Sequence, residues 1–197
     1  MGRYLGALST DVYGVSLQEL RIGKLALSAA QCATSDVDAI LDGQASASDE
    51  VTVVTEFLAQ PPYPRNLIIT PGGTTADVKA GSITVTGTNI KNEVISEDFA
   101  FLADASTATV GAKAFKTVTS VSIPAQDGAG ATFDVGFGDK LGLPFMADEN
   151  TVIQVVVDGV IETTAPAVVF DVDEIEKNTV DLNSALDGSI VEIIFAL

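Results

Sequence analysis

With 197 residues, of which 47% are hydrophobic and 19% charged, the chain is long enough and apolar enough to bury the core of one substantial domain. Its formal net charge of −17 argues against anionic partners, which bind clusters of lysine and arginine. We therefore expect no binding to nucleic acid and no docking on a membrane. The single cysteine, Cys32, excludes an intramolecular disulfide and predicts a small buried thiol.

The chain gives no sign of a membrane anchor or an export signal. No apolar run reaches the ~20 residues of a transmembrane helix. The first residues, Met1 to Gly6, lack the apolar block of a signal peptide. We therefore expect a protein that is made and assembled in the cytoplasm.

Residues 1–50 differ in composition from the rest of the chain and predict an N-terminal arm. Ser35 stands where it would cap a short helix that Gly43 would end. The polar run 44–50 then predicts a solvated connection. We expect an arm with one or two short helices over residues 1–50, either packed in the core or ordered against a neighbouring subunit. A β-domain over residues 51–197 would follow it.

From Val51 onward the pattern predicts short β-strands. The clearest alternation is in residues 132–137, where Phe133, Val135 and Phe137 face one way. No segment after residue 50 has the length or the periodicity of a helix. The predicted strands are residues 51–58, 66–70, 82–86, 94–101, 118–123, 132–137, 152–157, 160–163, 168–172 and 189–195.

Turn and breaker residues separate these strands. The prolines of residues 61–64 cannot supply the N–H groups of a central strand, and Asp158-Gly159 suits a two-residue type I′ hairpin. Gly136, Gly138 and Gly142 predict a bulge or a tight loop around Asp139 and Lys140, whose side chains would form a local ion pair. About ten short strands without long helices are typical of a mainly β fold, here an antiparallel β-sandwich of the Ig-like or jelly-roll type.

The sequence contains no histidine, which excludes a Ser-His-Asp or Cys-His catalytic centre and a His-ligated metal site. The glycine-rich run 71–75 lacks the lysine of a phosphate loop and predicts a turn. A carboxylate pair for glycoside hydrolysis would need no histidine, but no pair of acidic residues stands out. We therefore expect no enzyme, and we assign no catalytic, cofactor-binding or metal-binding residues.

An acidic cluster over Asp171 to Glu176 leaves two interpretations open. Its carboxylates are the hard oxygen ligands that Ca²⁺ prefers, but the spacing and the turn glycine of an EF-hand are missing. A solvated acidic segment that leads out of a strand explains the same residues, and the sequence favours this second interpretation.

Five segments in a fixed order resemble one group of proteins. The segments are Pro64-Arg-Asn-Leu67, Ile83 to Asn89 with Val94 to Glu97, Lys113 to Val121, Gly136 to Pro144 and Glu176 to Gly188. Over residues 60–197 their order resembles that in small virion structural proteins of tailed bacteriophages, of the capsid decoration or head-fibre type. The resemblance implies a non-enzymatic particle component present in many copies, and it carries over no catalytic or metal residue.

The resemblance leads us to expect a capsid decoration protein on the outer surface of the virion head. Its partners would be the major capsid protein and further copies of the chain, with a cyclic trimer as one arrangement. The acidic charge suits an outward position, away from packaged DNA. The alternative is a head- or tail-fibre module that binds a host receptor or a glycan through its loops.

Aromatic and aliphatic residues near the N-terminus are the candidates for contact with the shell or a sister subunit, because such side chains dominate interface cores. These candidate partner-binding residues are Tyr4, Leu5, Tyr13, Leu17 and Leu20. Removal of the arm, about residues 1–27, is expected to abolish binding to the particle and to leave the β-domain folded.

Overall fold

The fold is described by a computed structural model over residues 21–196, and residues 1–20 and Leu197 lie outside the described residues. Strands make up 51% of the chain and helices 3%, so the predicted mainly β fold is confirmed. The helices of the described part are two single 3₁₀ turns, η1 (Thr75–Asp77) and η2 (Ile175–Lys177). Within residues 21–196, no helix has the length and apolarity needed to cross a membrane.

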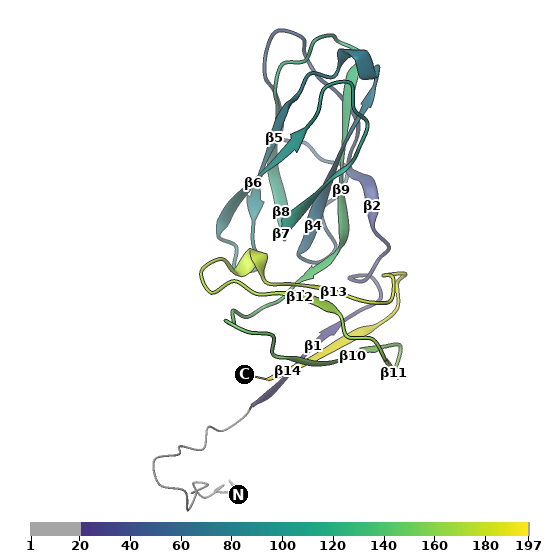
Figure 1. Cartoon of the computed structure of the whole chain (residues 1–197), viewed down its shortest axis with the longest axis vertical. Coiled ribbons are helices and arrows are strands. Elements are labelled where there is room, and N and C mark those ends of the chain that lie inside the picture. The colour runs from purple at the N-terminus through teal and green to yellow at the C-terminus, as the bar shows by residue number, and fades with distance from the viewer. Residues whose placement is uncertain (1–20, 197) are drawn as a thin grey trace, which may run out of the picture.

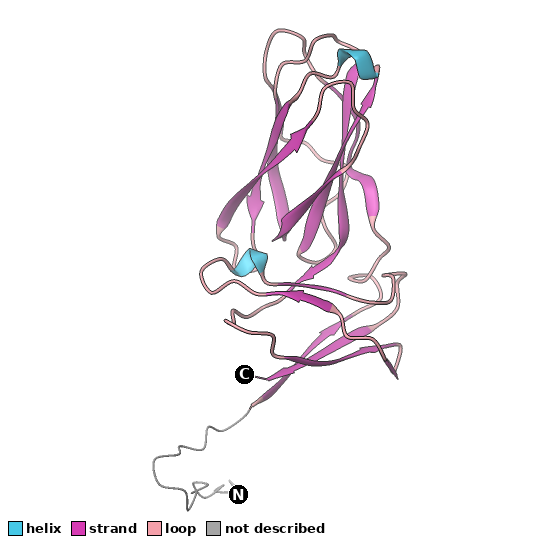
Figure 2. Cartoon of the chain, viewed as in Figure 1, coloured by secondary structure: helices cyan, strands magenta, loops and turns pink. Residues whose placement is uncertain are grey.

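Strands of residues 21–196 form three antiparallel sheets (Figure 1, Figure 2). The end sheet, at the lower end of Figure 1, has the order β1 (Ile22–Leu27), β14 (Val191–Ala196), β10 (Val152–Val157) and β11 (Val160–Ile161). The spanning sheet has the order β12 (Ala167–Val169), β13 (Thr179–Asp181), β9 (Ala131–Gly142), β4 (Arg65–Gly73) and β7 (Thr109–Phe115), and β2 (Asp36–Ala45) also pairs with β9. The cover sheet has the order β3 (Thr52–Val54), β8 (Thr117–Ile123), β5 (Gly81–Thr88) and β6 (Val94–Phe101).

The described residues form two hydrophobic cores, and the strands that carry them lie one above the other in Figure 1. The upper core is filled by side chains of the cover sheet and of β2, β4 and β9, and the lower core by side chains of the end sheet and of the chain around β13. Strand β9 reaches both, since Phe133, Val135 and Phe137 belong to the upper core and Leu141 to the lower one. One long strand therefore connects the part of the molecule around the upper core, which we call the upper body, to the part around the lower core, which we call the lower body.

Alternating side chains place several strands where the sequence predicts them. Ile83 and Val85 of β5 are fully buried in the upper core, as the alternation of residues 82–86 predicts. The hairpin between β10 and β11 also forms, with φ of 47° at Asp158 and 80° at Gly159. Both angles lie in the left-handed region that a type I′ turn requires. Pattern and turn chemistry agree at these places, so the local sequence is sufficient to predict them.

The described part of the predicted N-terminal arm, residues 21–50, contains no helix, so the helix predicted from Ser35 to Gly43 is wrong. Residues 36–45 form β2, and its pairing with β9 buries Ile40 and Leu41 in the upper core. Gly43 does not end a helix; it adopts a φ of 57° inside the strand, and its N–H donates to Asp134 Oδ1 at 2.6 Å. Pairing with a strand far along the chain outweighs the local helix signals.

Strand β1 also comes from the region predicted as an arm. It pairs with β14 along its whole length, and Leu27 at its end is buried in the lower core. The described part of that region thus contributes two strands to the sheets. The division of the chain into residues 1–50 and 51–197 stays a prediction.

Gly136 of β9 tests how closely β2 must approach its neighbour. A Cβ atom there would overlap the carbonyl groups of Asp36 and Val37, which are backbone atoms that cannot turn aside. We expect Gly136→Ala to lower the free energy of unfolding by about 3 kcal/mol, measured by urea denaturation. Gly72→Ala is the matched control, since the nearest atom to its Cβ would be the Thr132 hydroxyl at 3.3 Å. Equal losses in the two variants would contradict this explanation.

Candidate attachment surface

The predicted partner-binding residues have no described position. The described chain begins at Arg21, directly before β1 of the end sheet, and Figure 1 places the start of β1 at the lower end of the molecule. Strand β1 of the end sheet is therefore the first described element after them in the sequence. All five lie outside the described residues, and their role stays a prediction: Tyr4, Leu5, Tyr13, Leu17 and Leu20.

The end sheet has one buried face and one exposed face. Residues directly opposite each other in antiparallel strands share a face, so the register separates the two. The inner face packs into the lower core through Leu27, Val155, Val191, Ile193 and Phe195. The outer face carries Ile22, Lys24, Ala26, Gln154, Val156, Ile161, Glu192, Ile194 and Ala196.

The outer face of the end sheet is apolar and carries no net charge. Its two charged side chains pair with each other, since Lys24 Nζ donates to Glu192 Oε1 at 2.7 Å. Aliphatic side chains surround this pair, and Ile22 and Ile161 are 68% and 56% exposed. The whole chain carries a charge of −17, whereas interface cores are depleted of charge. The outer face is therefore well suited to attachment.

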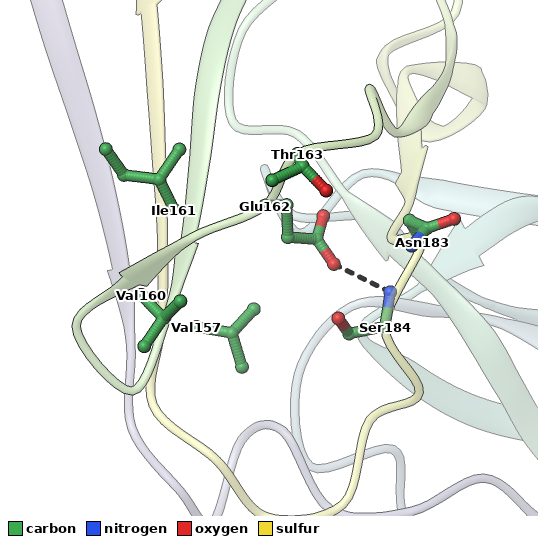
Figure 3. Close-up of a pocket in the computed structure, with 7 residues that line it drawn as sticks. All are labelled: Val157, Val160, Ile161, Glu162, Thr163, Asn183 and Ser184. Atoms are coloured by element: carbon green, nitrogen blue, oxygen red, sulfur yellow. Dashed lines mark hydrogen bonds between the residues drawn. The ribbon is translucent and has the colours of Figure 1, made fainter.

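A pocket of about 380 Å³ lies beside β11 at the rim of the end sheet (Figure 3). Val157, Val160 and Ile161 give it an apolar side, and Glu162 is the one charged residue among those that line it. The backbone N–H of Ser184 donates to Glu162 Oε1 at 2.6 Å, while Oε2 is buried without a hydrogen-bond partner. The pocket extends the apolar surface of the end sheet around the β11 hairpin.

Arg65 lies fully buried at the junction between the upper and lower bodies. Its Nε donates to the Gly138 carbonyl oxygen and its Nη1 to the Ala33 carbonyl oxygen, both at 2.6 Å, and its Nη2 donates to Asp139 Oδ1 at 3.4 Å. The guanidinium also lies over the Phe137 ring, 4.9 Å from its centroid. Burial lowers the pKa of Arg65, and the charge of Asp139 opposes that shift. One cation thus holds β4, β9 and the chain between β1 and β2 together.

The predicted bulge in β9 is confirmed. Strand β4 pairs Leu67 with Phe137 but Arg65 with Leu141, so β9 has two more residues than β4 between these pairs. Gly138 lies inside this bulge, and its carbonyl oxygen is the one that accepts from Arg65 Nε. The register shift therefore creates the place that the guanidinium occupies.

Asn66, the neighbour of Arg65 on β4, is also buried against the bulge. Its Oδ1 accepts from the backbone N–H of Lys140 at 2.9 Å, and its amide occupies the space that a Cβ atom at Gly138 would need. The predicted ion pair between Asp139 and Lys140 is wrong, because Asp139 faces Arg65 instead. The bulge thus accommodates buried polar side chains.

The acidic segment Asp171 to Glu176 is held by hydrogen bonds and lysines. Asp171 Oδ1 accepts from the backbone N–H groups of Asp173 and Glu174 at 2.9 Å each, and these hydrogen bonds lower the pKa of Asp171. Lys177 lies 3.6 Å from the other oxygen of Asp171. Among residues 21–196, no group of three or more His, Cys, Asp or Glu side chains is arranged to hold a metal ion.

Lys113 of β7 connects this acidic segment to the upper body. Its Nζ donates to Glu174 Oε1 at 2.8 Å and to Glu176 Oε1 at 3.3 Å. Burial lowers the pKa of Lys113, but the two carboxylates outweigh burial and raise it above the usual value. Glu176 is itself buried and also accepts from the Asn89 amide at 3.3 Å. These polar contacts hold η2 against the upper body.

No protein-family model, curated protein or solved structure matches the chain. The resemblance to virion structural proteins therefore depends on the sequence segments alone. What the chain does is inferred below from the outer face of the end sheet together with that resemblance.

Arg65→Met tests whether the junction depends on the buried cation. The substitution leaves the carbonyl oxygens of Gly138 and Ala33 buried without donors, so we expect the free energy of unfolding to fall by about 3–5 kcal/mol. The control is Lys79→Met, which removes a surface cation 3.8 Å from Asp127, and its expected loss is below about 0.5 kcal/mol. Urea denaturation followed by circular dichroism measures both, and similar losses would show that the junction does not need Arg65.

Lys113→Met leaves Glu174 and the buried Glu176 without their lysine, and we expect it to lower the free energy of unfolding by about 2 kcal/mol at neutral pH. Folding raises the pKa of Lys113. Its contribution to the free energy of unfolding is therefore complete below the usual pKa of 10.5 and is lost as the pH rises through the pKa of the folded state. The difference between wild type and variant should therefore narrow above pH 10.5. Denaturation of the double variant Lys113→Met, Glu176→Gln provides the check: it should recover part of the loss, and no recovery would argue against the pairing.

Proposed function

We propose that this chain is a non-enzymatic structural protein of a tailed-phage virion, a capsid decoration protein that binds the outer capsid lattice of the head. The observation that carries the proposal is the outer face of the end sheet, which is exposed, apolar and without net charge in a chain of −17. The resemblance of residues 60–197 to virion structural proteins supplies the kind of particle. The major capsid protein is the partner for this face.

The shape of the molecule supports attachment through the end sheet. Figure 1 shows an elongated molecule with the end sheet at one end and the upper body at the other. Bound by its end sheet, the molecule directs the upper body, in this proposal a β-sandwich of the Ig-like or jelly-roll type, away from the shell. The rest of the chain, which carries the net charge of −17, then faces solvent and not the packaged DNA, as the repulsion between carboxylates and phosphates favours.

Residues 1–20 supply a second contact with the shell in this proposal. The five predicted partner-binding residues lie in this segment, and their aromatic and aliphatic side chains are of the kind that anchors interfaces. A deletion that reached Leu27 would remove β1 and a side chain of the lower core. The deletion that tests the segment therefore ends at Leu20.

Ile161→Lys tests the outer face against a matched site, Val110→Lys on β7, because both side chains are 56% exposed. We expect Ile161→Lys to weaken binding to particles that lack the protein by about tenfold or more, because attachment would bury the lysine without a partner. Val110→Lys should bind as wild type does. Co-sedimentation with such particles measures the affinity, and imaging of the bound density locates the copies.

Saturable binding in many symmetric copies on the head, lost when residues 2–20 are removed, is the expected result. Density at the tail alone, or no binding, would contradict the decoration role. Those results would favour the alternative of a head- or tail-fibre module, for which a specific hit on a glycan array is the positive sign.

A further inference from the structure

The upper core is incompletely covered along one edge of the upper body. Three hydrophobic side chains packed against it are only partly buried, namely Ala39, Val54 and Phe57. All three lie on β2, on β3 or directly after β3. A groove of about 650 Å³, which we call the edge groove, runs between residues of these two strands and has Leu41 and Leu58 among its lining residues.

The opposite edge of the upper body is closed by hydrogen bonds between the sheets. Glu97 of β6 accepts from the backbone N–H groups of Ala112 at 2.7 Å and of Lys113 at 3.3 Å on β7. Thr109 of β7 also donates to the carbonyl oxygen of Ala100 on β6 at 2.9 Å. At the edge between β2 and β3 the sheets are joined by one backbone hydrogen bond, from the N–H of Leu58 to the carbonyl oxygen of Ile40 at 3.0 Å, and the edge groove beside it leaves apolar surface open.

Strand β3 presents a free edge beside the groove. It pairs with β8 on one side and, within residues 21–196, with no strand on the other. A free edge has backbone N–H and C=O groups with which a further extended segment can pair. A strand added here would cover Val54 and Phe57 and complete the upper core.

The sequence contains a segment with the pattern that such a strand needs. In residues 12–17, the apolar side chains of Tyr13, Val15 and Leu17 alternate with Gly14 and Ser16. This is the period of a strand that buries one face.

The charge of the edge groove is compatible with this segment. Asp42 and Glu56 line the edge groove, and the sequence has no lysine or arginine between residues 25 and 64. A segment with further acidic residues would be repelled there. Residues 12–17 carry no charged side chain and therefore enter without that repulsion.

The segment of the same copy is too short to reach the edge groove. Leu41 lines the groove and lies at the same height as Ile69, since both pair with Val135 of β9. Ile69 follows Arg65 by four residues on β4, so the groove lies ~13 Å further along the strand than Arg65. Strand β1 begins at the lower end of the end sheet in Figure 1. The side chains of the lower core separate this sheet from the chain around β13, and packed sheets lie ~10 Å apart. The five peptide units from Leu17 to Ile22 span at most ~18 Å. A second copy is therefore the donor.

We propose that residues 12–17 of one copy add as a strand to β3 of a second copy and fill its edge groove. Donor segment and acceptor groove are different parts of the molecule, so the contact is heterologous. It joins copies head to tail, in a closed ring such as the predicted trimer or in an open row. This contact between copies goes beyond the attachment to the shell proposed above and does not depend on it. It assigns Tyr13 and Leu17 to a sister subunit, the second of the two partners expected for the segment, and leaves Tyr4, Leu5 and Leu20 for the shell.

Analytical ultracentrifugation of the full chain tests the contact through two variants. Val15→Asp places a charge in the donor segment, and Leu58→Asp places the same charge in the groove at a side chain that is 74% exposed. We expect wild type to self-associate and each variant to have its dissociation constant raised about tenfold or more. Leu102→Asp is the control, matched in charge and 76% exposed, and it should associate as wild type does.

A mixture of the two variants gives the sharpest result. Val15→Asp still offers a groove and Leu58→Asp still offers a segment, so the mixture should form one-to-one dimers and nothing larger. The proposal is overturned by a monomeric wild type, by a mixture that stays monomeric, or by a Leu102→Asp variant as defective as Leu58→Asp. Particle binding is measured separately: Val15→Asp molecules that fail to associate but still co-sediment with particles would leave the attachment proposal standing.

Discussion

The arrangement of this molecule depends on how the buried charge of Arg65 is satisfied. A guanidinium without water is unfavourable unless its donors find acceptors, and the acceptors here are the backbone carbonyl groups of Gly138 and Ala33. Gly138 lies in the bulge of β9, and Ala33 lies in the chain between β1 and β2. The bulge cannot be straightened without the loss of one acceptor, and the connection cannot move without the loss of the other. A single cation therefore fixes the point at which the upper body ends and the lower body begins.

Around Arg65 the junction is a polar layer between two apolar cores. The buried Asn178 continues it. Its side-chain amide donates to the backbone carbonyl oxygens of Asp171 and Glu174, and its backbone carbonyl oxygen accepts from the N–H of Leu143. Hydrophobic contact is non-directional, so two apolar cores alone would resist rotation of one body against the other only weakly. Hydrogen bonds have a defined geometry, and the polar layer therefore sets the direction in which the upper body stands on the end sheet. A protein attached by its end sheet needs that direction to be constant.

The sequence was informative wherever alternation or turn chemistry acts locally, as in β5 and at Asp158-Gly159. The sequence is misleading where pairing with a distant strand decides the structure. The adjacent residues Ile40 and Leu41 of β2 are both buried, which is not the alternation of a strand, and residues 36–45 form a strand because they pair with β9. Arginine is ordinarily exposed, and the two carbonyl acceptors of Arg65 lie 73 and 32 positions away along the chain, so its burial has no local signature. The sequence does not reveal the outer face of the end sheet, the proposed attachment surface, for the same reason. Its central pair, Lys24 and Glu192, is separated by 168 positions and is brought together by the register of β1 and β14. The predicted anchors within residues 1–20 remain predictions.

A chain of −17 has few surfaces on which it can associate, because copies repel one another. The outer face of the end sheet escapes this repulsion by balancing Lys24 against Glu192, and residues 12–17 escape it by carrying no charge. In the proposed assembly these neutral parts meet different partners, the outer face at the end of the molecule and the edge groove along the upper body. A neighbour standing at the same height on the shell has its groove as far above the end sheet as the groove of the same copy, which residues 12–17 cannot reach. The contact between copies is therefore proposed for molecules arranged head to tail, and not for neighbours standing side by side on the shell. Screening distinguishes the two contacts, because salt weakens the repulsion between acidic neighbours over a Debye length of ~8 Å at physiological ionic strength. Contact between copies should therefore strengthen with salt, whereas attachment through a charge-balanced face should respond little.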